Sequence, residues 1–272
     1  MNMKQLLPIN FICTFILVST LLLFTSSCKN ASESKTEEVE TIDNNLKYKL
    51  TPFSESTLYP DATLSLSSYK NGQFDFMVKS DNYELGAQTP DAEQKMCANS
   101  GKGQHIHLIL DSDPYLAKYE ATFTHEVTDG AHYMLAFLSR SYHESIKTNT
   151  SFIAQKVEVK DNSITAGEDI AGEMIFYSRP KGTYVGKANT DKVMLDFFLV
   201  NTELGADRKV KVEINGEVHL IDQWQPYYIE GMPMGKNTIT LTLVDGNESA
   251  LDVPNNPVSR DFELKADPSE DI

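Results

Sequence analysis

The feature that most constrains the fold of this chain is an internal repeat. FDFMV at 74–78 and LDFFL at 195–199 are each followed a few residues later by the letters ELGA. Ile106–Leu116 then corresponds to Val210–Leu220, in the same order and at nearly the same spacing. Because several landmarks recur in one order, we interpret most of the chain as two copies of one module.

Each copy has the period-two pattern of half-buried β-strands. Ile106, Leu108 and Leu110 alternate with the residues between them, and Val210, Val212 and Ile214 do the same in the second copy. Asn-Gly and Asp-Gly turn signals separate these segments. The pattern predicts an all-β chain with two tandem Ig-like antiparallel β-sandwich domains, at 47–160 and 161–266. A closed barrel is the alternative.

The N-terminus has the pattern of a secretory signal. Lys4 precedes an apolar run at 11–24, and small residues lead to Cys28. The run is short for a membrane span, and the pattern predicts a signal peptide at 1–27. We expect Cys28 to carry lipid, residues 28–46 to be a flexible acidic tether, and 267–272 to be an acidic tail. The alternative is an ordinary signal peptide in which Cys28 is incidental.

These features predict export and anchoring by lipid to the bacterial cell envelope, at the outer membrane or the periplasmic face. The formal net charge of −15 argues against nucleic acid as a partner, because phosphate backbones repel an acidic chain. With Cys13 removed and Cys28 lipidated, Cys97 is the one remaining cysteine, so no internal disulfide is expected. Cys97 is a buried small hydrophobe, a metal ligand or an exposed thiol.

Histidine is distributed unequally between the two copies. Five of the six histidines fall in the first copy: His105, His107, His125, His132 and His143. The positions matched to four of them in the second copy are Lys209, Lys211, Asn237 and Asn247. Because the module is retained but the imidazoles are not, we expect a role specific to the first copy.

The spacing of these histidines suggests a metal site. His105 and His107 lie two apart on one predicted strand, so both side chains point away from the core, outward or into a cleft. We expect strand pairing to bring His132 to them, with His143 at the rim. Such a group suits copper or zinc, and sulfur from Met134 would favour copper. Recognition of a polar ligand, or a purely structural role, remains open for the same histidines.

A second candidate surface is aromatic. Trp224, Tyr227 and Tyr228 lie together in a QWQPYY segment that could bind a peptide or a glycan, or cover the end of a sandwich. Arg140 is the one arginine near the histidines, and it is a candidate contact for a phosphorylated ligand. The sequence contains no G-x-S-x-G, H-E-x-x-H or P-loop motif, so we expect a binding protein and not an enzyme.

Two segments resemble known proteins. Gly101–Glu120 and Asp129–Lys147 resemble lipoproteins of marine Bacteroidetes that carry the label phosphopeptide-binding protein. More loosely, residues 104–111, the Gly130-Ala131-His132 segment and His143 are similar to a histidine-rich periplasmic β-domain family of unknown function. That family has a further histidine where this chain has Ile106. The resemblance implies a periplasmic lipoprotein with a β-fold and a peptide or phosphopeptide ligand.

Overall fold

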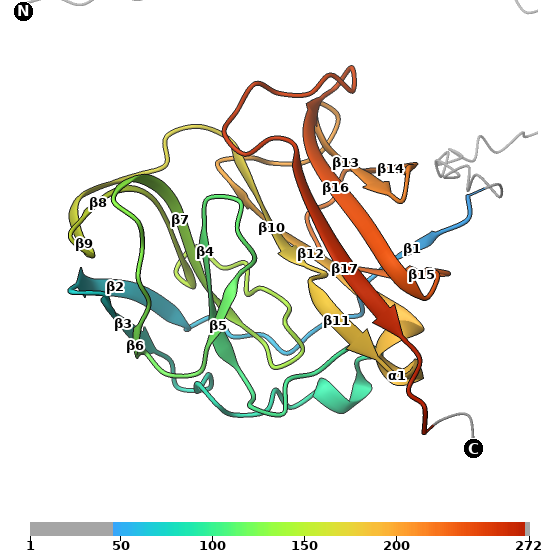
Figure 1. Ribbon diagram of the computed structural model, residues 1–272, viewed down its shortest axis with the longest axis horizontal. Coiled ribbons are helices and arrows are strands. Elements are labelled where there is room, and N and C mark those ends of the chain that lie inside the picture. Colours follow the sequence, from blue (N-terminus) through green and yellow to red (C-terminus); the bar gives the residue numbers. More distant parts are fainter. Residues whose placement is uncertain (1–45, 270–272) are drawn as a thin grey trace, which may run out of the picture. The chain divides into compact units, whose positions relative to one another are not determined.

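Strand pairing divides the chain into two β-sandwiches, each built from two sheets (Figure 1). The computed structural model describes residues 46–269. The expectations for the signal peptide, for Cys28 and for most of the tether therefore concern residues outside the described range. Within that range, no helix is both long and apolar enough to span a bilayer. The strand content and pairing confirm the all-β sandwich class.

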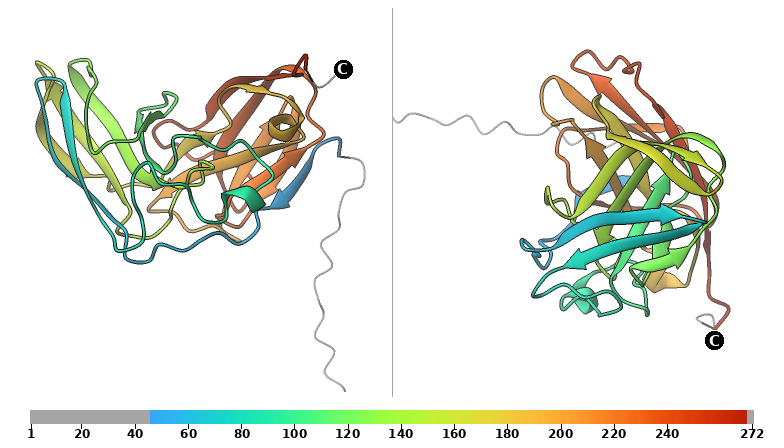
Figure 2. Two further views of the ribbon diagram at one scale, coloured as in Figure 1. Left: turned by 90° about the horizontal axis from the view of Figure 1, so that it is seen from below. Right: turned by 90° about the vertical axis from the view of Figure 1, so that its left-hand side faces the viewer.

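The first sandwich packs a three-stranded sheet against a five-stranded one (Figure 2). In spatial order the smaller sheet contains β2 (Thr63–Lys70), β3 (Gln73–Lys79) and β6 (Thr122–Thr124). The larger sheet contains β5 (Leu116–Lys118), β4 (His105–Leu110), β7 (Gly130–Ser139), β8 (Phe152–Lys160) and β9 (Ser163–Asp169). A short 3-10 turn, η1 (Ala92–Gln94), lies in the loop before β4. Ile106, Leu108 and Met134 are part of the core between the sheets.

The second sandwich packs a four-stranded sheet against a five-stranded one. The first contains β1 (Lys49–Pro52), β15 (Tyr227–Glu230), β12 (Lys192–Val200) and β10 (Met174–Arg179). The other contains β11 (Gly182–Val185), β17 (Val258–Lys265), β16 (Gly235–Asp245), β13 (Arg208–Ile214) and β14 (Glu217–Ile221). Pairing is antiparallel except between β11 and β17. A short helix, α1 (Lys187–Thr190), connects β11 to β12.

The strand order of the first sandwich recurs in the second, as the repeat predicts. β4 pairs with β5 and β7, and β13 pairs with β14 and β16 in the same way. The repeated glycines also have equivalent contacts: Gly86 donates its N–H to the carbonyl of Gln104, and Gly205 donates to the carbonyl of Arg208. The first copy differs by a longer loop before β4, which contains η1 and Cys97.

The expected domain boundaries need two corrections. Strand β9 pairs with β8 in the first sandwich, so the expected boundary between residues 160 and 161 falls inside a β-hairpin. Strand β1 pairs with β15 of the second sandwich, although it lies in the segment assigned to the first. Both differences have one cause: the hydrophobic pattern marks a strand but does not choose its hydrogen-bonding partner.

The two sandwiches share a buried joint. Ile109, Leu135 and Phe137 on the outer face of β4 and β7 pack against Phe176 and Phe198 on the outer face of β10 and β12. Strands β10 and β12 are therefore buried on both faces, with inward residues such as Leu195 and Phe197 in the core of the second sandwich. The described residues, 46–269, accordingly belong to one compact unit.

Candidate metal centre

Three histidines converge at the joint between the sandwiches. The ligand-capable nitrogens of His105, His107 and His143 all lie within 4.8 Å of one another. His105 Nε2 is 2.8 Å from His107 Nε2 and 3.1 Å from His143 Nδ1. Histidine, cysteine, aspartate and glutamate side chains can all hold a metal ion. Among the residues of the described range, these three histidines form the one group of such side chains that is compact enough to do so.

Strand β4 places His105 and His107 on its outer face, together with Ile109. The sequence predicts this face to point outward or into a cleft, and that expectation is wrong, because both imidazoles have no exposed surface. The outer face of β4 is covered by the second sandwich, so the side chains opposite the core enter a second buried layer. The His107 ring stacks on Tyr115 at a centroid distance of 3.6 Å, and His105 lies against Tyr119.

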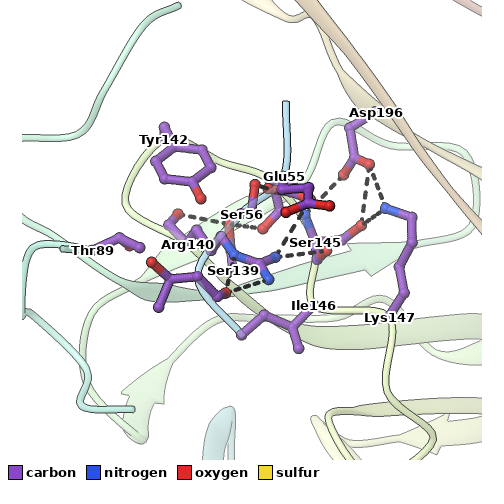
Figure 3. A network of polar contacts seen from close by, with 12 residues as sticks. Glu55, Ser56, Thr89, Ser139, Arg140, Tyr142, Ser145, Ile146, Lys147 and Asp196 are labelled. Carbon is purple, nitrogen blue, oxygen red and sulfur yellow. Dashed lines mark hydrogen bonds and ion pairs between the residues drawn. The ribbon is translucent and has the colours of Figure 1, made fainter. Parts of the chain in front are cut away.

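His143 reaches this group from the tight loop after β7. Its backbone is left-handed, with φ of 72°, and its N–H donates to the carbonyl of Arg140. The same loop is fixed on both sides by polar contacts (Figure 3). Arg140 donates from Nε and Nη2 to the carbonyl of Thr57, and Ser145 donates from N and Oγ to the carboxylate of Asp196 in β12. The loop therefore holds His143 in a defined position at the joint.

The hydrogen bonds of the rings orient three nitrogens toward the centre of the group and fix the tautomer of His105. His105 Nδ1 lies 2.8 Å from the carbonyl oxygen of Gly103, which can only accept, so a neutral His105 has an unprotonated Nε2. His107 Nδ1 lies 3.4 Å from Ser178 Oγ of β10, a hydroxyl that can donate or accept and that orients the ring with Nε2 toward His105. In a tetrahedral zinc site two ligand nitrogens lie about 3.3 Å apart. The two separations from His105 Nε2, 2.8 and 3.1 Å, are close to that value.

The surroundings keep these imidazoles neutral. Burial lowers the pKa of His105 to about 4, and it also lowers the pKa values of His107 and His143. The positive charges of Arg179 and Lys181 act in the same direction on all three rings. A neutral imidazole is the form that binds a metal, so the group is ready for coordination at neutral pH.

His132 does not belong to this group. Its Nδ1 lies 2.7 Å from Asp111 Oδ2, and its Nε2 lies 2.8 Å from the carbonyl of Thr128. Along β7, His132 is five residues from Phe137, which pairs with His107, so about 17 Å of strand separates them. His132 also lies on the face of β7 that points toward the core of the first sandwich, opposite the face that meets the other two histidines. The expectation that His132 joins the pair and His143 stays at the rim is therefore reversed.

The other candidate ligand contacts are buried or half-buried. Met134 has no exposed surface and packs in the core of the first sandwich, so it is not a sulfur ligand. Tyr227 and Tyr228 are also buried, and Tyr228 packs against Phe53. Trp224 donates its indole N–H to the carbonyl of Phe197 and contacts the Phe198 ring edge to face. These aromatics cover a sandwich, as the alternative interpretation states, and they present no open platform for a peptide or glycan.

Arg140 is a structural residue in this arrangement. It is 5% exposed, contacts the carbonyl of Thr57 and lies 3.5 Å from Glu144 Oε1. Its charge is thus already compensated, which disfavours the role of phosphate contact. Cys97 is the buried small hydrophobe of the three alternatives, since it packs against residues such as Met194 and burial raises its pKa to about 12.

The turn geometry corrects one detail of the repeat. Equivalent hydrogen bonds join Arg140 to Glu144 and Asp245 to Ser249, so His143 corresponds to Glu248 and not to Asn247. Glu248 has the same left-handed backbone, with φ of 64°. The second copy thus keeps the turn but places a carboxylate where the first copy has its third imidazole.

Three residues at the site have no signal in the sequence. Ser178, Arg179 and Lys181 come from the second sandwich, and Ser178 lies 71 positions from the histidine that it contacts. No period or motif connects positions so far apart. Tyr115, by contrast, lies in the repeated segment 106–116, and an aromatic residue close to the histidine strand could have drawn attention to it.

Comparisons with known proteins add little to this geometry. No protein-family model and no curated protein matches the chain. Among solved structures, the chain is similar to the fibronectin(III)-like modules of CbhA from Clostridium thermocellum, with 17% identity and a TM-score of 0.27. That match covers 34% of this chain and 98% of the module.

Two longer matches are weaker still in sequence. One is the extracellular domain of a B. thetaiotaomicron protein named as a hybrid two component system, with 10% identity and a TM-score of 0.26, covering 79% of this chain and 40% of that one. The other is a Ca²⁺-stabilised adhesin with which an Antarctic bacterium binds ice, with 10% identity and a TM-score of 0.24, covering 78% and 50%. Likenesses of this size carry no argument about ligand or activity, and the site must be interpreted from its own residues.

Proposed function

We propose that this chain is a non-enzymatic, membrane-anchored binding lipoprotein whose first sandwich binds a transition metal ion, copper or zinc, through His105, His107 and His143. The observation that carries the proposal is the convergence of three ring nitrogens within 4.8 Å in a buried site. Without a metal, a ring N–H of His107 or His143 can donate to the unprotonated His105 Nε2, and a bound cation would replace that proton and take the three nitrogens as ligands.

The donor set favours copper or zinc over harder ions. All three ligands are imidazole nitrogens, and Ca²⁺ or Mg²⁺ would require oxygen ligands that this group lacks among the residues of the described range. Three neutral ligands leave a position for a fourth, exogenous ligand. The burial of His105 and His107 makes ligand exchange slow, which suits a stored or carried ion better than catalytic turnover.

Metal titration of the full chain in detergent tests this proposal. Copper and zinc are added to metal-free protein and followed by calorimetry, with elemental analysis of the product. We expect one ion per chain, and we expect His105→Ala, His107→Ala and His143→Ala each to weaken binding about 100-fold or more, because two nitrogens hold an ion much less tightly than three.

Two control variants separate the site from incidental histidine binding. His132→Ala removes the histidine that pairs with Asp111, and His219→Ala removes one that pairs with Glu217 in the second sandwich. Both should bind metal like the wild type. Wild-type protein without a bound ion, or equal losses in control and site variants, would refute the metal function.

The anchor is tested separately with Cys28→Ala in the producing bacterium. We propose that lipid on Cys28 retains the chain at the cell envelope, so this variant should move from the membrane fraction to the soluble exported fraction. Metal binding should be the same in both forms, since the tether is remote in sequence from the three histidines. A Cys28→Ala chain that stays with the membrane would exclude a lipid anchor at this residue.

A further inference from the structure

Two positive charges of the second sandwich border the histidine group. The ammonium of Lys181 lies 3.9 Å from the centre of the Tyr115 ring, and the guanidinium of Arg179 lies 5.7 Å from it. The same ring stacks on His107 with an angle of 8° between the planes. Lys181 also donates to the carbonyl oxygen of Tyr115. A chain with a net charge of −15 therefore places two cations beside a buried group of histidines.

The charge of Arg179 has no acidic partner nearby. The side chain is 7% exposed, and its Nη1 donates to the hydroxyl of Tyr184 at 2.6 Å. No carboxylate among residues 46–269 lies within salt-bridge distance of it. Its cross-strand neighbour Asp196 is bound instead by Lys147 and Ser145. Burying a charge without a counter-charge costs free energy. A negatively charged group bound beside Arg179 would therefore be stabilised.

Tyr115 does not supply that negative group as a metal ligand. Its ring lies parallel to His107 at 3.6 Å, so the phenol oxygen is well above the plane in which His107 Nε2 would hold an ion. The hydroxyl nevertheless lies 3.4 Å from His143 Nδ1. It is therefore placed to donate a hydrogen bond to a ligand that sits beside the ion.

We propose that the metal at His105, His107 and His143 takes a small anion, a carboxylate or an inorganic oxyanion, as its fourth ligand, with Lys181 and Arg179 as counter-charges and Tyr115 as hydrogen-bond donor. This inference rests on the proposed metal function. A divalent ion on three neutral imidazoles would otherwise add two charges to a site that already holds two cations. An anion on the metal compensates both sets of charges.

The test uses copper-loaded full chain in detergent, with azide as the probe, because azide bound to copper(II) gives a charge-transfer absorption band. We expect azide to bind to the wild type, and Lys181→Met to weaken azide binding about tenfold while copper stays bound. Lys236→Met is the control, since that lysine is 73% exposed and pairs with Asp261 in the second sandwich. Arg179→Lys keeps the charge and should bind azide better than Arg179→Met.

Competition then identifies the class of anion. Acetate that displaces azide favours a carboxylate ligand, and inorganic phosphate that displaces it favours an oxyanion. Copper-loaded protein without an azide band, or equal azide affinity in the wild type and Lys181→Met, overturns the inference and leaves the metal function standing. A wild-type chain that binds no copper removes the metal function and this inference together.

Discussion

Lys147 of the first sandwich and Asp196 of the second form a buried ion pair across the joint, with Nζ 2.7 Å from Oδ1 and no exposed surface on the aspartate. The same carboxylate accepts hydrogen bonds from Ser145, two residues after His143 (Figure 3). The position of the third histidine in the candidate metal centre is thus fixed by a residue of the other sandwich.

Replacing Asp196 should therefore affect both stability and metal binding. We expect Asp196→Ala to lower the free energy of unfolding by about 3–5 kcal/mol, because it leaves Lys147 without its partner. Copper affinity should fall as well, since the loop that carries His143 loses its anchor. Urea denaturation and metal titration measure the two effects. Asp261→Ala, which removes an exposed pair, should change stability far less, because water screens that pair.

Ser178 should tune the metal centre without holding the ion. Its hydroxyl is 3.4 Å from His107 Nδ1 and helps to orient the ring so that Nε2 faces the other two histidines. We expect Ser178→Ala to weaken copper binding about tenfold, as is usual when a ligand histidine loses its outer partner. Ser259→Ala, at a serine that bonds Thr240 on the surface, is the control. Unchanged affinity in Ser178→Ala would show that packing alone orients His107.

The aromatic joint should couple folding to metal binding. Phe198 has no exposed surface and contacts Phe137, Phe152 and Trp224. We expect Phe198→Ala to cost about 3–5 kcal/mol of stability and to weaken copper binding. Phe262→Ala, in the core of the second sandwich alone, should cost a similar amount and leave copper affinity intact. Equal copper affinity in both folded variants would argue against the coupling.

His132 should make the free energy of unfolding depend on pH, independently of the metal centre. Burial lowers its pKa, but hydrogen bonds to Asp111 and to the carbonyl of Thr128 outweigh burial and raise the pKa above 6.5. Its stabilising contribution is therefore complete below the pKa of the unfolded chain and is lost as pH rises through the folded value. The stability difference between the wild type and His132→Asn should shrink from pH 5 to pH 8.

The ion pair between His132 and Asp111 is partly exposed to solvent. Its contribution to the free energy of unfolding should therefore stay below about 1 kcal/mol. Denaturant unfolding of both proteins at several pH values measures it. In an Asp111→Asn background the same His132→Asn comparison should lose most of its pH dependence, because the carboxylate that favours the imidazolium is gone. A difference that grows with pH would contradict the assigned direction of the pKa shift.

The sequence predicts the sandwich fold because alternation and turn signals are local properties. The pattern at Ile106, Leu108 and Leu110 identifies a core face, and all three contact the core of the first sandwich. The repeat likewise predicts that the strand order occurs twice. The unequal distribution of histidine correctly directs attention to the first copy, where His105 and His107 must share one face of a strand.

By itself, the sequence determined the strands, the duplication and the shared face of His105 and His107, because each depends on residues that are close together along the chain. Only the tertiary structure decided that this face is buried, that His143 and not His132 completes the group, and that Ser178, Arg179 and Lys181 surround it. Those outcomes depend on strand register and on the packing of one sandwich against the other. Both arise from contacts between residues far apart in sequence, for which no local pattern exists.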